Sequence, residues 1–130
     1  FLELAALDGN ICFHAEKSGA QPVHCTDYQA YGGREDDEDT NMFVSSTGAA
    51  IPDGSTTSFG VHGNILTLSI CLRRSTVQAA RVNVYDLSPG LLPSGEADIV
   101  HMGGLFYHLK HLVLAARSLF AVTGSVLIFE

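Results

Sequence analysis

The chain has 130 residues, the size of one domain with its own core. Hydrophobic residues make up 46% and charged residues 16%, against about 25% charged in an average domain, which excludes wholesale disorder. A net charge of −7 gives no basic excess for nucleic-acid binding, and no apolar run reaches the roughly 18 residues of a membrane-spanning helix.

The first 27 residues predict a strand, a helix and a second strand. Residues 1–6 are apolar and end at an Asp-Gly-Asn turn, and residues 11–18 show helical spacing. Residues 22–26 are β-prone and lead to Asp27. This order describes one βαβ unit, which predicts a parallel strand pair with a right-handed crossover.

Residues 28–58 are predicted to form a loop or lid inserted after that unit. The stretch is rich in glycine and serine, and its acidic run at 34–39 holds five acids and one arginine, a net charge of −4. We expect this run to be solvated rather than to bind a metal, because adjacent acids do not converge on one ion without a specific turn. Residues 42–44 are a candidate short strand.

The rest of the chain alternates between helical and extended patterns. Helices are predicted over 59–74 and 105–121, and strands over 77–85, 97–102 and 125–130. The whole order predicts an α/β fold, a single Rossmann-like three-layer sandwich over residues 1–130 with a mostly parallel sheet of about five strands.

The three cysteines, Cys12, Cys25 and Cys71, do not form a disulfide framework, because their number is odd and their spacing wide. Their usage is typical of the cytoplasm, and Cys12 and Cys25 are expected to be buried. No Cys-x-x-Cys pair is present, so a thiolate zinc site is not predicted. His108 and His111 stand three apart on a predicted helix but lack a third ligand, and no metal is expected.

Ligands of such sheets bind beyond the carboxyl ends of the strands. Four of these ends are polar or glycine-rich: residues 5–10, Asp27, residues 85–87 and residues 101–108. An acid at the second strand end can accept hydrogen bonds from ribose hydroxyls. The dinucleotide fingerprint G-x-G-x-x-G is absent, which weakens a nicotinamide or flavin interpretation.

Several segments resemble class I S-adenosylmethionine-dependent methyltransferases. The text FLELAALDG at 1–9 and the segments 13–20 and 23–27 are similar to the opening of that family, and ADIV at 97–100 with GLFYHLKH at 104–111 resembles a later part. VYDLSP at 84–89 and TGSVLIFE at 123–130 resemble its third and fifth strands. The wording is closest to the branch that includes the tRNA wobble-uridine (carboxy)methyltransferases.

This resemblance implies a methyltransferase that uses S-adenosyl-L-methionine, here as a fragment whose C-terminal strands are missing. Catalytic roles would fall to His108 and Tyr107, which would face the methyl group or its acceptor. The cofactor would contact the turn after the first strand, the ends of the next strands and the adenine side, namely Glu3, Ala5, Ala6, Asp8, Gly9, Asp27, Tyr85, Asp86, Leu87, Met102 and Gly103. Ala5 departs from the family, which prefers glycine there.

The acidic balance favours a small-molecule acceptor over RNA, no membrane partner is expected, and the oligomeric state is unknown. Two other classes stay open. An NAD(P)-dependent oxidoreductase would use the same acid and helix N-terminus, and a non-catalytic remnant of a Rossmann-like domain would explain Ala5 and the abrupt ends.

Overall fold

The computed structural model describes residues 1–28, 42–44 and 60–130. Their strands form one sheet in the order β3-β4-β2-β1-β5-β6. The strands are β1 (Leu2–Leu4), β2 (His24–Asp27), β3 (Met42–Val44), β4 (Gln78–Arg81), β5 (Ala97–Met102) and β6 (Thr123–Phe129). The helices are α1 (Asn10–Lys17), α2 (Gly60–Arg73) and α3 (Leu112–Ala121), with 3₁₀ turns η1 (Val84–Asp86) and η2 (Phe106–His108).

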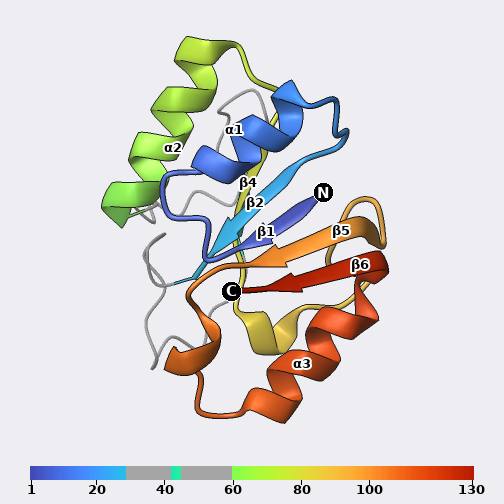
Figure 1. The fold of residues 1–130 in the computed structure, drawn as a ribbon. Helices are drawn as coiled ribbons and strands as arrows, with labels where there is room; N and C mark the ends of the chain where they lie inside the picture. The colour runs from blue at the N-terminus through green and yellow to red at the C-terminus, as the bar shows by residue number, and fades with distance from the viewer. Residues whose placement is uncertain (29–41, 45–59) are drawn as a thin grey trace.

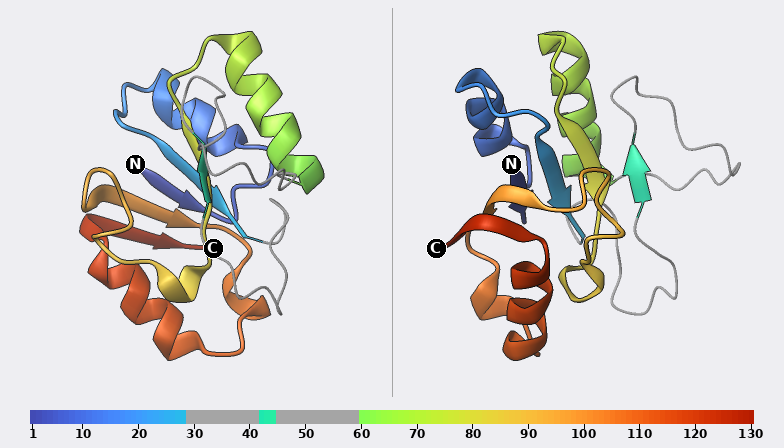
Figure 2. Two further views of the ribbon diagram at one scale, coloured as in Figure 1. Left: turned by 180° about the vertical axis from the view of Figure 1, so that it is seen from behind. Right: turned by 90° about the vertical axis from the view of Figure 1, so that its right-hand side faces the viewer.

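The sheet is mostly parallel and is covered on both faces. Five strands run parallel, whereas β3 pairs antiparallel with β4 at one edge. Helices α1 and α2 cover one face and α3 covers the other (Figures 1 and 2). The expected α/β fold, a Rossmann-like three-layer sandwich, is therefore confirmed, and so is the short strand at 42–44. The acidic run at 34–39 lies outside the described residues.

Two apolar cores fill the spaces between the layers, because successive side chains of a strand point to opposite faces. Leu2 and Leu4 point toward α3 and pack with Val100. The core on the other face includes Cys25 and Leu66, both fully buried. Burying one such leucine contributes about 1.5–3 kcal/mol. Glu3, which lies between Leu2 and Leu4, consequently points into the layer that α1 covers.

The predicted helix over 105–121 is wrong in its first third. The segment forms η2 and then an extended residue, Leu109 (ψ 135°), before α3 begins at Leu112. The hydroxyl of Tyr85 accepts a hydrogen bond from the His111 amide at 3.2 Å, which holds this linker against η1. His108 and His111 therefore do not share a helix face, and the spacing that suggested a histidine pair has no structural meaning.

The predicted strand over 77–85 is also too long, since β4 ends at Arg81. The chain then turns into η1, where the Asn83 side chain accepts a hydrogen bond from the Tyr85 amide at 3.1 Å. Alternating valines continue the strand pattern past Arg81, but this local cap stops the pairing. No helix in the described ranges is long and apolar enough to cross a membrane.

Candidate functional site

A cavity of about 880 Å³ lies beyond the carboxyl ends of β1, β2, β4 and β5. This volume is within the usual range for small-molecule sites, about 300–1,000 Å³. Six of the residues predicted for the cofactor or for catalysis line it: Ala5, Asp27, Tyr85, Gly103, Tyr107 and His108. The fold thus brings together residues from four separate strand ends, as expected for a parallel sheet.

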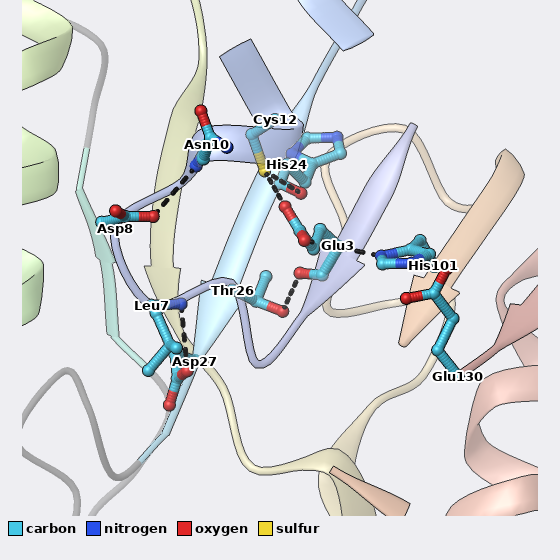
Figure 3. Close-up of polar contacts among 10 residues, drawn as sticks. All are labelled: Glu3, Leu7, Asp8, Asn10, Cys12, His24, Thr26, Asp27, His101 and Glu130. Carbon is cyan, nitrogen blue, oxygen red and sulfur yellow. Dashed lines mark hydrogen bonds and ion pairs between the residues drawn. The ribbon is translucent and has the colours of Figure 1, made fainter. Parts of the chain in front are cut away.

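The turn after β1 forms one wall of this cavity in an unusual backbone conformation. Ala5 has φ 59° and Leu7 has φ 48°, both in the left-handed region that L-residues rarely adopt. Such a conformation costs about 1–2 kcal/mol per residue. Two hydrogen bonds hold the turn in place. The Ala6 amide donates to the Thr26 carbonyl at 3.0 Å, and the Leu7 amide donates to Asp27 Oδ2 at 3.3 Å, as Figure 3 shows. The β2 end therefore supports the strained turn.

Asp27 stands at the junction of this turn and the cavity. It is the last residue of β2 and is 9% exposed. The Leu7 amide bond reaches one of its oxygens, and an ionised carboxylate acts only as an acceptor, with about four acceptor sites. The side chain has the chemistry needed to accept hydrogen bonds from paired hydroxyl groups of a ligand.

Three other residues of the predicted turn have structural roles and do not line the cavity. Gly9 has φ 77° and is so tightly packed that an added Cβ would lie 2.4 Å from Leu66 Cδ1. The side chain of Asp8 accepts a hydrogen bond from the Asn10 amide at 3.2 Å and so supports the first turn of α1. Ala6 is buried in the core beneath α1 and α2.

The opposite wall is built by the segment after β4. Tyr85 lines the cavity, its carbonyl accepts a hydrogen bond from Ser118 Oγ at 3.2 Å, and its ring meets that of His111 edge-on. Asp86 is exposed and Leu87 is buried in the core, and neither lines the cavity. Asn83 lines it instead. Sequence reasoning missed this residue, although a polar side chain just before a turn is a recognisable capping signal.

The end of β5 and η2 form the third side. Gly103 lines the cavity, whereas Met102 is fully buried in the core facing α3. Tyr107 is 75% exposed and lies against His108, with ring centroids 4.4 Å apart. Tyr107 and His108 both line the cavity and are both exposed. They are placed to contact a ligand that projects from the cavity.

Glu3 belongs to a different cluster, which lies in the layer between the sheet and α1. Its Oε2 accepts a hydrogen bond from Cys12 Sγ at 3.0 Å, and its Oε1 lies 3.4 Å from His101 Nδ1 (Figure 3). Burial raises the pKa of the Glu3 carboxyl, although the contacts with Cys12 and His101 oppose this. Glu3 does not line the cavity.

Comparison of the chain with protein-family models, with curated proteins and with solved structures found no match. The fold and the cavity define an α/β Rossmann-like domain with a ligand-sized site beyond the strand ends.

Proposed function

We propose that this domain binds S-adenosyl-L-methionine in the 880 Å³ cavity and transfers its methyl group to a small-molecule acceptor. The observation that supports this most is the position of Asp27, a buried carboxylate at the end of β2 that faces the cavity beside the β1 turn. A carboxylate at this point of a parallel α/β sheet suits a ribose diol. The resemblance of several segments to class I methyltransferases agrees with the same ligand, and a cytoplasmic location belongs to the same proposal.

Methyl transfer requires little covalent chemistry from the protein itself. S-adenosyl-L-methionine, when bound, would supply the methyl group from its sulfonium to the acceptor, and the electron pair of the broken carbon–sulfur bond would stay on sulfur. Positioning two reactants and excluding water can therefore supply most of the rate. The enclosed inner wall, with Asp27 and the β1 turn, would hold the adenosyl part, and the more open side at η2 would admit the acceptor.

His108 and Tyr107 are the side chains proposed to meet the acceptor. A hydroxyl or amine acceptor must lose a proton during or after transfer, and histidine is the side chain best suited to take it near neutral pH. The Tyr107 hydroxyl would orient the acceptor. If His108 is the base, His108→Ala should lower the transfer rate at least about 100-fold while the affinity for the cofactor product stays unchanged. If His108→Ala keeps the wild-type rate between pH 6 and 8, His108 is not the base and only lines the cavity.

Isothermal titration with S-adenosylhomocysteine, and separately with NAD, tests the proposal directly. Asp27→Asn keeps the size of the side chain but removes its charge. It should weaken S-adenosylhomocysteine binding roughly 10- to 100-fold, because hydrogen bonds to a charged acceptor contribute about 1.5–3 kcal/mol. The matched control is Asp98→Asn on the exposed part of β5, which should bind like the wild type.

The outcomes separate the three classes considered. Binding of S-adenosylhomocysteine that depends on Asp27 supports the methyltransferase. Binding of NAD alone would replace it with an oxidoreductase, and binding of neither ligand by the folded chain would favour a non-catalytic domain. Tight, salt-sensitive binding of tRNA in a filter assay would make RNA the acceptor in place of a small molecule.

A further inference from the structure

Three side chains with metal-ligating atoms converge in the layer between the sheet and α1. Glu3 comes from β1, Cys12 from α1 and Cys25 from β2, where Cys25 is the register partner of Glu3. One carboxylate oxygen and the two sulfur atoms all lie within 4.8 Å of one another. Both cysteines are fully buried and Glu3 is 4% exposed. The positions of these three residues in the sequence do not match the spacing of a metal-binding motif, so the cluster can be recognised only in the folded structure.

The spacing of these atoms suits a single ion held between them. Zinc binds thiolate sulfur at about 2.3 Å and carboxylate oxygen at about 2.0–2.2 Å, so two sulfurs on one zinc lie at most about 4.6 Å apart. The ligand type also selects the metal: two thiolates and one carboxylate suit zinc or a similar borderline-soft ion, whereas calcium and magnesium require oxygen ligands. Small adjustments of the Cys12 and Cys25 side chains would close the site.

A fourth residue supports the same interpretation from the other side of Glu3. His101 on β5 is 6% exposed, and its Nδ1 lies 3.4 Å from Glu3 Oε1. In the described part of the chain this buried nitrogen has no partner at hydrogen-bond geometry. An imidazole beside the outer oxygen of a ligating carboxylate is a common supporting residue of metal sites, because a hydrogen bond from its N–H orients the ligand. His101 lies close enough to Glu3 to take this role after a small adjustment of its ring.

We propose that Glu3, Cys12 and Cys25 bind one Zn²⁺ ion inside the fold, with His101 as the residue that positions Glu3. The ion would tie α1 to β1 and β2. Its role is structural, because the site is closed to solvent and does not line the ligand cavity. The ion must therefore enter while the chain folds, and its binding adds to the stability of the folded state.

Burial of the cysteines also affects how the proposed site would bind a metal ion. Desolvation raises the pKa of the Cys12 thiol, and the nearby Cys25 and Glu3 raise it further. The Cys12 thiol donates a hydrogen bond to Glu3 Oε2 at 3.0 Å. Zinc binds cysteine as the thiolate, so the ion would replace this thiol proton when it binds.

The test uses Co²⁺ as a spectroscopic probe of the whole chain, refolded from denaturant after removal of metals. The wild type should take up one equivalent of Co²⁺, with the sulfur-to-cobalt charge-transfer absorption of a site with two thiolate ligands, and Zn²⁺ should displace it. Cys12→Ser and Cys25→Ser should each lose this spectrum. Cys71→Ser is the matched control, because Cys71 is an exposed thiol on α2 outside the cluster.

Further variants keep the test decisive if a cysteine variant fails to fold. Glu3→Gln keeps the side-chain volume and an acceptor for Cys12, and it should lower the affinity for Co²⁺ at least about tenfold. His101→Leu should lower it about 10- to 100-fold, with partial recovery in His101→Gln, which restores an N–H donor. Circular dichroism would establish that these variants are folded.

Two results would overturn the proposal. One is a refolded wild type that shows no charge-transfer band at millimolar Co²⁺. The other is a band that depends on Cys71 and survives in Cys12→Ser or Cys25→Ser. An increase in the unfolding temperature on addition of Zn²⁺, seen in the wild type and in Cys71→Ser and smaller in Glu3→Gln, would be the supporting result independent of spectroscopy.

Discussion

Gly9→Ala should destabilise the fold by about 3 kcal/mol, for two separable reasons. The residue has φ 77°, a conformation that costs an L-residue about 1–2 kcal/mol. The new methyl group would also lie 2.4 Å from Leu66 Cδ1 and 3.0 Å from Cys25 Sγ, and overpacking of a filled core costs about 1–3 kcal/mol. Against these, alanine restricts the unfolded chain and returns about 0.4–1 kcal/mol.

Gly95→Ala isolates the backbone part of this effect. Gly95 has φ 78°, almost the same as Gly9, but an added Cβ there would meet no atom within 4 Å. It should therefore destabilise the fold by only about 1 kcal/mol, which leaves about 2 kcal/mol of the Gly9 effect to the contacts with Leu66 and Cys25.

Urea unfolding followed by circular dichroism measures both variants under identical conditions. With a slope near 2 kcal/mol per molar urea, the midpoint of Gly9→Ala should lie about 1–2 M below that of the wild type. Equal losses in the two variants would refute the packing argument. A Gly9→Ala protein with wild-type stability but weakened ligand binding would instead return Gly9 to the ligand site that the sequence resemblance implies.

Two predictions concern pH. Desolvation, together with the nearby N-terminal charge, lowers the pKa of His24 below its ordinary 6.5. The contribution of His24 to stability is therefore complete above pH 6.5. It is lost as the pH falls from 6.5 toward the pKa of His24 in the folded state. His24→Gln should unfold with a weaker pH dependence between pH 7 and 5, and an identical slope would remove His24 from the effect. Although desolvation opposes it, hydrogen bonds from Ser75 and Thr76 lower the pKa of Glu16. Glu16→Gln should therefore be less stable to unfolding than the wild type by about 1 kcal/mol at pH 7. This difference in stability should vanish near pH 3, because the stabilisation by the Glu16 carboxylate is present above pH 4.5 and is lost below it. A difference that persists at pH 3 would contradict this.

Local sequence patterns were sufficient for most of the architecture. Period-two and helical patterns located most of the strands and helices to within a few residues, and the βαβ order implied a parallel sheet with its site at the strand ends. Asp27 could be placed at that site from sequence because it ends a β-prone run, and in the structure it is the last residue of β2. These features depend on side-chain periodicity and on turn residues, which act between near neighbours in the chain.

Contacts between distant segments decided the rest. The helix expected from residue 105 begins only at Leu112, because the Tyr85 hydroxyl holds the His111 amide from a segment 26 residues earlier. Gly9 looked like part of a ligand turn, and only the packing of α2 shows that Leu66 occupies the space beside it. Tertiary structure alone also sets Glu3 beside Cys12 and Cys25, because strand pairing and a crossover helix bring together atoms that no sequence spacing relates.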